Sequence, residues 1–337
     1  MRRRLATLGA GLALLTAACG TGGASDTREA PKTASARAAV AVERLAENTV
    51  VPLEGPAPVP ELPVTVDSSD SRKVTVADAS RILPLNGGVA ETVFTLGLGK
   101  NVVGRDITAT FEEAKKLPQV TKAHDVSAES VLSLRPTVVL ADTDTGPEEA
   151  LDQIRAAGVP VVVLDPATKL ADVTTRTTRI AAALGVPDAG KALNSRMGKE
   201  LSEARAGVPA GSRPKVAFLY MRGSAAVYLI GGKGSGADSL LEEAGAQDAG
   251  VAAGFTRPFT PITTEALAQA SPDVILMMTK GLDSVGGLSG LLQVPGIAQT
   301  PAGMNERVVD MEDGVLLSFG PRTPLVIDIL VDRIHRP

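Results

Sequence analysis

Residues 127–140, SAESVLSLRPTVVL, have a counterpart in residues 263–276, TTEALAQASPDVIL. Each stretch begins with a Ser or Thr that can cap a helix, and each ends with a proline turn and an apolar strand. In both, a glutamate (Glu129 or Glu265) precedes the proline by seven positions. A supersecondary unit that occurs once in each half of a chain indicates two related lobes.

The sequence around the two copies predicts the same organisation. Short apolar strands alternate with helical segments over residues 73–164, and again from residue 215 to the end of the chain. Such alternation predicts parallel βαβ units. Residues 172–207 are almost wholly helical in pattern, with a break at residues 185–188. The predicted fold class is therefore α/β, with two Rossmann-like lobes joined by a single long backbone helix.

The expected domains follow from this pattern. We place an N-terminal α/β lobe at residues 73–170, a helical linker that includes the backbone helix at 171–212, and a C-terminal α/β lobe at 213–337. Residues 19–72 contain five closely spaced prolines between residues 52 and 63, which disfavour a helix, so we expect a flexible tether there. The net charge of −4 counts against a nucleic-acid partner.

The first residues, MRRRLATLGAGLALLTAAC, combine three arginines with an apolar stretch that is too short to span a bilayer. The segment LTAAC resembles a bacterial lipobox. That resemblance implies a signal peptide at residues 1–18 and lipid attached to Cys19, the only cysteine of the chain. Two or more acyl chains would hold the protein on the extracytoplasmic face of the cell membrane. The alternative is an ordinary signal peptide with a chance cysteine.

An anchored tether followed by lobe, helix and lobe resembles the substrate-binding lipoproteins of ABC importers. These belong to the BtuF/FhuD-like periplasmic binding proteins, class III of the substrate-binding proteins. The resemblance implies a partnership with a membrane permease and its ATPase, and it implies that Glu129 and Glu265 dock onto arginines of that permease. Without the two-lobe context, the preferred interpretation is that each glutamate is an acid favoured by the dipole of a helix's first turn.

Two further stretches resemble the haem-binding lipoproteins of the HmuT type: residues 120–136, VTKAHDVSAESVLSLRP, and residues 218–223, FLYMRG. The resemblance implies that His124 and Tyr220 ligate the haem iron from opposite faces. It also implies that Met278, in the stretch MMTKGLDSVGG, lies beside the haem. Haem would then be the transported ligand and not a resident cofactor.

The residue chemistry agrees with this interpretation. Tyr220 and Arg222 are two apart, so on an extended strand their side chains point to one side. A guanidinium beside a phenol favours the phenolate, and tyrosine is a known ligand of haem iron. Tyr228 is the competing phenol, and we expect it near the haem together with Arg222. Lys233, in the glycine-rich stretch of residues 231–236, is a candidate for holding a propionate.

Other functions fit less well. A ferric siderophore or cobalamin is the alternative ligand within the same family, but an aromatic content of 2% leaves few side chains to stack on a catecholate. A zinc or manganese site needs several histidines and carboxylates, and the chain has two histidines. The glycine-rich stretch does not match a phosphate-binding loop, and the sequence has no HExxH motif or nucleophile elbow. We therefore expect a haem carrier and not an enzyme.

Overall fold

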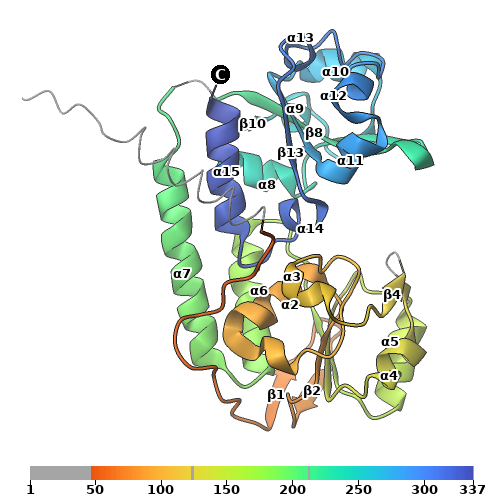
Figure 1. Cartoon of the computed structure of the whole chain (residues 1–337), viewed down its shortest axis with the longest axis vertical. Coiled ribbons are helices and arrows are strands. Elements are labelled where there is room, and N and C mark those ends of the chain that lie inside the picture. The colour runs from red at the N-terminus through yellow and green to blue at the C-terminus, as the bar shows by residue number, and fades with distance from the viewer. Residues whose placement is uncertain (1–46, 123–124, 212, 337) are drawn as a thin grey trace, which may run out of the picture.

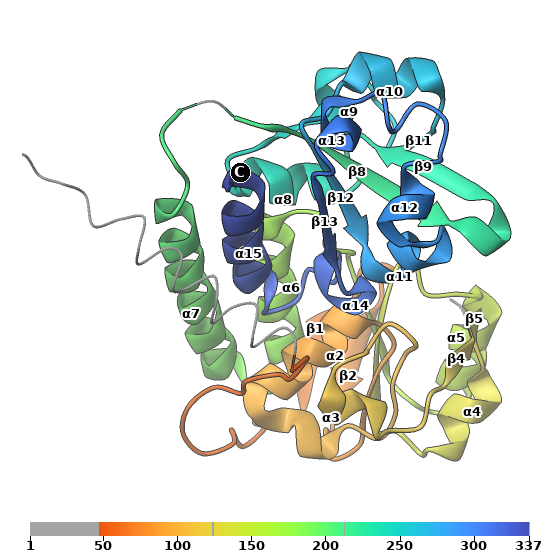
Figure 2. The same ribbon diagram turned by 45° about the horizontal axis from the view of Figure 1, so that its top comes forward.

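The computed structural model describes residues 47–122, 125–211 and 213–336, and Figure 1 shows two α/β lobes, one above the other. The helix α7 (Pro187–Ala206) runs along one side of both lobes. Figure 2 shows the same arrangement after a 45° turn. The predicted fold class, two α/β lobes with a long backbone helix, is confirmed.

The N-terminal lobe is built on a parallel sheet in the order β3-β6-β7. Successive residues of its strands point to opposite faces of the sheet, and both faces are buried. Val138 and Leu140 of β6 pack into one core cluster, and Val139 and Ala141 pack into another. The strands and the helices that cover the two faces have the following bounds: β3 (Ile82–Pro84), β6 (Val138–Asp142), β7 (Val161–Leu164), with α2 (Gly87–Val93) and α6 (Leu170–Ala183) on the first face and α4 (Ala128–Ser133) and α5 (Glu148–Ala156) on the second.

The expected tether ends earlier than residue 72. A hairpin of β1 (Val64–Asp67) and β2 (Lys73–Val76) belongs to the N-terminal lobe, and the Ser69 amide donates to Val163 O at 2.9 Å. Upstream, residues 48–62 form a strap along the lobe that is tied down by backbone hydrogen bonds such as Leu53 N to Thr95 O (2.8 Å). The prolines exclude a helix from this strap but do not prevent it from packing. The predicted signal peptide, Cys19 and the first part of the predicted tether fall within residues 1–46, which lie outside the described residues.

The C-terminal lobe contains a mixed sheet in the order β11-β9-β8-β12-β13, with β10 paired to the start of β8. Strands β8, β10, β12 and β13 are parallel, and β9 and β11 are antiparallel to their neighbours. The bounds are β8 (Lys215–Arg222), β9 (Val227–Gly231), β10 (Gln247–Asp248), β11 (Phe259–Pro261), β12 (Val274–Met278) and β13 (Val308–Met311).

Helices cover both faces of this sheet as well. One face packs on α8 (Ala237–Glu243) and α15 (Thr323–His335), and the other on α9 (Ala249–Ala252), α10 (Thr264–Ala270), α12 (Gly287–Leu291) and α13 (Pro301–Met304). Two short helices, α11 (Thr279–Ser284) and α14 (Asp313–Leu316), follow the carboxyl ends of β12 and β13. Figure 1 shows α14 at the edge of the lobe that faces α2.

The two lobes share one continuous core on the side of α7. Leu193 and Met197 of α7 belong to the same buried cluster as Ile180 of α6 and Ile327 of α15. The helix begins with Pro187 at its first turn, where a missing amide hydrogen costs nothing. A shared apolar core favours a rigid connection between the lobes over a wide hinge motion.

Candidate ligand-binding site between the lobes

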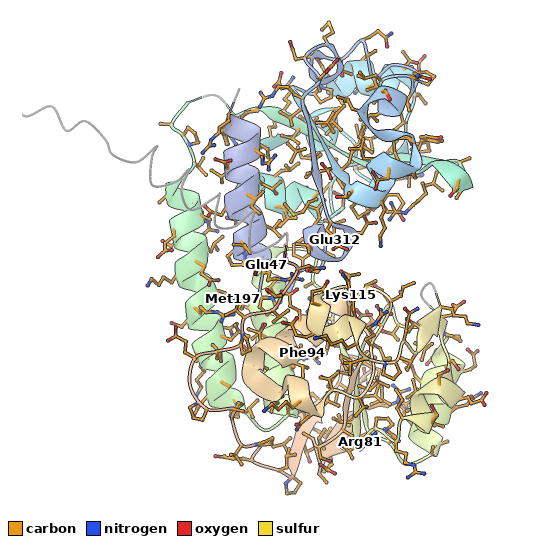
Figure 3. All side chains as sticks on the ribbon, viewed as in Figure 1. Glu47, Arg81, Phe94, Lys115, Met197 and Glu312 are labelled. Atoms are coloured by element: carbon orange, nitrogen blue, oxygen red, sulfur yellow. The ribbon has the colours of Figure 1, made fainter. Side chains whose placement is uncertain are left out.

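The lobes face each other across the carboxyl ends of their parallel strands. In Figure 1 the helices that follow these strands, α2 below and α14 above, meet at the boundary. Figure 3 shows Lys115 of the lower lobe and Glu312 of the upper lobe on the facing edges. The Thr110 hydroxyl donates to Glu312 Oε2 at 3.2 Å across this boundary. Open α/β sheets bind ligands beyond the carboxyl ends of their strands, so this boundary is the candidate site.

Tyr220 and Arg222 lie together at the carboxyl end of β8, as the sequence predicts. The guanidinium carbon of Arg222 is 4.7 Å from the centroid of the Tyr220 ring. The other side of the phenol contacts Phe259 of β11, with ring centroids 5.8 Å apart. The Tyr220 side chain is half-buried, so its phenol is placed at a strand end by packing while part of it stays accessible.

Asp313 fixes the position of Arg222 and was missed in the sequence. The Arg222 Nη2 donates to Asp313 Oδ2 at 2.7 Å, and Nη1 donates to Met221 O at 2.9 Å. Asp313 Oδ1 also accepts from the Lys280 amide at 3.0 Å, which ties β8, α11 and α14 together. The residues of the ion pair are 91 positions apart. The only signal for Asp313 is that a polar stretch directly follows a strand.

Met278 lies on the same face of the sheet as Tyr220. It ends β12 and is buried with 6% exposure. Its neighbour Met277 pairs with Leu219 and belongs to the cluster on the opposite face. Met278 therefore lies at the strand end on the face of Tyr220, whereas Met277 packs into the core on the opposite face.

The structure does not bring Tyr228 together with Tyr220, although the sequence predicts both near the ligand. It pairs with Met221 in the antiparallel β8–β9 ladder, whereas Tyr220 pairs with Leu229. Paired residues share a face of the sheet and neighbours alternate, so the two phenols point to opposite faces. The side chain of Tyr228 packs against the cluster beneath α10 and α12.

Lys233 also lies away from the strand ends. The glycine-rich loop follows Gly231, which pairs with Phe259, and the Lys233 amide donates to Phe255 O at 3.2 Å. Lys233 shares a surface hollow with Gln247, whose strand β10 pairs with the start of β8. The loop therefore lies toward the amino end of β8, and the expected contact with a propionate is not supported.

His124 lies outside the described residues, but the segments on each side of it are placed. The strands β4 (Thr121–Lys122) and β5 (Asp125–Val126) pair antiparallel. Two hydrogen bonds anchor them to the N-terminal lobe, from the Val126 amide to Gly146 O at 2.8 Å and from the Thr121 hydroxyl to Asp106 Oδ2 at 2.8 Å. Figures 1 and 2 show β4 and the tip of the β8–β9 hairpin on the same side of the molecule, one on each lobe.

Polar groups line the carboxyl ends of the N-terminal strands. Asp142 ends β6 and accepts hydrogen bonds from Asn86 Nδ2 (2.9 Å) and the Thr145 hydroxyl (3.0 Å). Burial raises the pKa of Asp142 above its ordinary value, and its hydrogen bond from Thr145 only partly offsets this. Asn86 also caps α2 by accepting from the Gly88 amide. This network orders the lower face of the candidate site.

Glu129 and Glu265 occupy equivalent places in the two lobes. Ser127 caps α4 and Thr263 caps α10, each by accepting a backbone amide three residues on. Each glutamate is the second residue of its helix, and both side chains are exposed. The pKa of Glu265 is lowered, because its own backbone amide and the Thr263 hydroxyl donate to the carboxylate. The repeat seen in the sequence is thus a repeat of structure, and it presents one exposed acid on each lobe.

No helix in the described part of the chain is long and apolar enough to cross a membrane. The described residues likewise hold no cluster of three or more His, Cys, Asp or Glu side chains of the kind that binds a metal ion. Cys19 lies outside the described residues.

Comparison with known proteins extends this description. The crystal structure of the haem-binding protein HmuT superposes with a TM-score of 0.80 at 38% identity, covering 86% of this chain and 95% of that one. The same protein has been crystallised with alanine in place of an arginine, a tyrosine or a histidine. The ABC transporter substrate-binding lipoprotein YvrC of Bacillus subtilis (strain 168) is 25% identical over 279 residues, 81% of this chain and 86% of YvrC.

A shorter match links the chain to another ligand class. The vitamin B12-binding protein of Yersinia pestis (strain Pestoides F) is 33% identical over 89 residues, which is 26% of this chain and 32% of that protein. Residues 82–314 match the family model described as periplasmic binding protein. Since this match spans both lobes and the helix between them, the chain belongs to the periplasmic binding protein family.

Proposed function

We propose that this protein binds haem between its lobes and delivers it to a membrane ABC permease. The observation that carries the proposal is the arrangement at the end of β8, where Arg222 lies over the Tyr220 ring and is held there by Asp313. In the crystallised HmuT variants the replaced tyrosine and arginine are two positions apart, as Tyr220 and Arg222 are. The second axial ligand of the haem iron would be His124 of the other lobe, in the segment between β4 and β5.

The residues of this chain would divide the work of binding. Tyr220 would supply an anionic oxygen to ferric iron, and the Arg222 charge beside it would favour that anion. Phe259 and Met278 would offer apolar contacts to the porphyrin from the same face of the sheet. Asp313 would orient Arg222 without touching the ligand.

A ferric siderophore or cobalamin is the alternative ligand, and the match to vitamin B12-binding proteins is the observation that favours it. That match covers a third of those proteins. A ligand whose metal already has all its coordination positions filled gains little from an axial tyrosine, whereas haem iron has axial positions open to protein ligands. The Tyr220–Arg222 pair therefore favours haem.

Delivery would depend on the lipid anchor at Cys19 and on the exposed glutamate of each lobe. Lipid on Cys19 would keep the protein at the extracytoplasmic face of the membrane, where the tether raises its effective concentration near the permease. Glu129 and Glu265 would dock onto basic side chains of the permease, whose ATPase drives uptake. Two carboxylates on separate lobes fix the register of such a complex. The protein itself would catalyse no reaction.

A haemin titration followed by absorbance tests this proposal. The full-length protein should bind about one haemin per chain, and Tyr220→Phe and His124→Ala should each change the spectrum and weaken binding by about tenfold or more. Tyr228→Phe is the matched control and should bind as the wild type does. Cys19→Ala should detach the protein from membranes and leave haemin binding intact. Tighter binding of cyanocobalamin than of haemin would favour the alternative ligand.

A further inference from the structure

The first turn of α14 lies against a segment of the other lobe. The Thr110 hydroxyl donates to Glu312 Oε2 at 3.2 Å, and the same oxygen accepts from the Gly314 amide at 2.7 Å. Figure 3 shows Glu312 on the edge of the upper lobe that faces the lower lobe. A single hydrogen bond at a boundary that is partly open to solvent adds little to stability, so this contact needs a different explanation.

Gly314 allows α14 to approach the Thr110 segment closely. A Cβ added at Gly314 would lie 2.9 Å from Thr108 O and closer still to the Thr110 hydroxyl. Because Thr108 O belongs to the backbone, it cannot turn away, and a larger residue at position 314 would push α14 off the segment. The close contact between the lobes at this point therefore depends on glycine.

The Thr110 segment is itself held firmly on the N-terminal lobe. Asn48 Nδ2 donates to Thr110 O at 2.9 Å. The neighbouring Phe111 is 1% exposed, and its ring packs edge-to-face on Phe94 with centroids 5.0 Å apart. Thr110 is thus a fixed point of the lower lobe, and α14 is positioned relative to it.

The next residue of α14 leads to the candidate ligand site. Asp313 follows Glu312 directly in the chain. Its Oδ2 accepts from Arg222 Nη2 at 2.7 Å, and the guanidinium carbon of Arg222 lies 4.7 Å from the centroid of the Tyr220 ring. Because Glu312 and Asp313 are neighbours in one short turn, a displacement of the first also displaces the second. The contact between the lobes is thereby connected to the charge beside the phenol.

We propose that Thr110, Glu312 and Gly314 position Arg222 over Tyr220 from across the lobe boundary, so that retention of the ligand depends on the contact between the lobes. This inference rests on the proposed function, because it takes Tyr220 as the iron ligand. When the lobes part, α14 loses its support, Arg222 moves from the ring, and the phenolate loses the positive charge that favours it. A small movement is enough, since hydrogen bonds weaken steeply as their geometry worsens.

The hydroxyl of Thr110 can be removed and restored with little change of shape. Haemin should leave Thr110→Val about two- to tenfold faster than the wild type, measured as transfer to excess apomyoglobin. Thr110→Ser keeps the donor and should release haemin as the wild type does. Thr65→Val is the control, because it removes a hydroxyl that is hydrogen-bonded to Thr75 (2.8 Å) in the β1–β2 hairpin, which Figure 1 shows at the far end of the lobe. This control should leave the rate unchanged.

Gly314→Ala should have a larger effect, because the added Cβ displaces α14 as a whole. In both variants the resonance Raman vibrations of iron-bound tyrosinate should change, which a general loss of stability would not produce. Gly198→Ala, whose Cβ meets nothing within 4 Å, is the matched control and should leave these vibrations and the release rate as they are. Thr110→Val introduces no clash and remains the test if Gly314→Ala does not fold.

A double-mutant cycle identifies the route of the effect. Arg222→Met removes the side chain through which the contact acts, so adding Thr110→Val to it should change haemin release little further. If Thr110→Val has its full effect in the Arg222→Met background as well, the contact only holds the lobes together, and its role in positioning Arg222 is overturned.

A measurement without haem separates this inference from the proposed function. Full-length protein in detergent, labelled with fluorotyrosine, gives one fluorine NMR resonance for each of its two tyrosines, assigned with Tyr220→Phe and Tyr228→Phe. Thr110→Val and Gly314→Ala should shift the Tyr220 resonance and leave that of Tyr228, on the opposite face of the sheet, in place. An unshifted Tyr220 resonance overturns the positioning role. If the resonance shifts but Tyr220→Phe binds haemin as the wild type does, the positioning role stands and the proposed function does not.

Discussion

Two arginine–carboxylate pairs connect distant parts of this chain, and they differ in burial. Arg322 and Glu91 meet where the lobes pack together, with side-chain exposures of 9% and 1%, and Arg322 Nε lies 3.0 Å from Glu91 Oε2. Arg222 and Asp313 meet at the end of β8, with exposures of 30% and 14%. The first pair is enclosed by protein, while the second keeps part of its guanidinium open to a ligand.

The neighbours of the two pairs sharpen the difference. The Arg322 amide also donates to Glu91 Oε1 (2.7 Å), and its Nη1 donates to Asn48 Oδ1 (2.9 Å), which ties the strap into the contact. Nearby, Arg176 Nη2 donates to Phe319 O at 2.6 Å. Arg222 is held by one carboxylate and one carbonyl and stacks on Tyr220. The buried pair therefore joins the two lobes, and we propose that the open pair serves the ligand.

Glu91→Gln should therefore give the largest loss of stability. It leaves the Arg322 charge buried without its partner, which costs about 3–5 kcal/mol. Urea unfolding measures this loss. Glu243→Gln is the control, because its pair with Arg205 is more exposed and should cost less than about 1 kcal/mol. A similar small loss for both variants would show that the Glu91–Arg322 pair does not stabilise the contact between the lobes.

Asp248 is a buried carboxylate that forms no ion pair with an arginine among the described residues, so it shows the effect of burial without such a pair. It is 7% exposed, its Oδ1 accepts from the Val251 amide (2.8 Å), and burial raises its pKa to about 6. The folded state then holds the proton more tightly than the unfolded state, whose pKa is near 3.8. The resulting stabilisation is present below that value and is lost as the pH rises through about 6.

Asp248→Asn keeps the cap on α9 and removes the titration. Relative to this variant, the wild type should lose up to about 3 kcal/mol of unfolding free energy between pH 4 and pH 7. Thermal or urea unfolding of both proteins across this range measures the difference. A difference that does not change with pH would mean that Asp248 titrates normally.

Gly88→Ala tests how closely the lobes pack near the buried pair. An added Cβ would lie 2.2 Å from Ser318 O and 2.5 Å from Arg176 Nη2, so the two lobes would have to move apart. We expect a loss of about 1–3 kcal/mol in urea unfolding. Gly198→Ala on α7 is the control, since its Cβ meets nothing within 4 Å and should stabilise the helix by up to about 1 kcal/mol. Equal effects would argue against tight packing at Gly88.

Local sequence patterns predicted much of this architecture. The alternation of strands and helices, the caps at Ser127 and Thr263 and the paired glutamates are short-range features that propensity and periodicity determine, and the structure confirms them. The strap was missed because prolines disfavour a helix without revealing that Val50 and its neighbours have a surface to pack against. Proline content alone does not distinguish a packed extended segment from a free one.

The site was harder to predict because it depends on contacts between distant residues. Tyr220 was identified by the resemblance to haem-binding lipoproteins, and the two-residue spacing then predicted that Arg222 points to the same side of the strand. Asp313, in contrast, reaches Arg222 from 91 positions away. Glu91 and Arg322 are 231 positions apart. The separation of Tyr228 from Tyr220 could not be predicted, because the face of the sheet that Tyr228 occupies depends on the register of β9 against β8. His124 stays a prediction, since it lies outside the described residues.

Arg222→Met completes the comparison with the smallest expected effect on the fold. Its pair with Asp313 is partly open to solvent, so we expect the unfolding free energy to change by less than about 1 kcal/mol. Haemin binding should weaken about five- to tenfold, because the cation 4.7 Å from the Tyr220 ring no longer stabilises an anionic oxygen there. Arg222→Lys keeps the charge but loses the planar contact with both the ring and Asp313, so its affinity should fall between those of the wild type and Arg222→Met. Haemin titrations and urea unfolding of the three proteins give both quantities. A large loss of stability with unchanged haemin affinity would reverse the roles of the two pairs, since the open pair would then be the structural one.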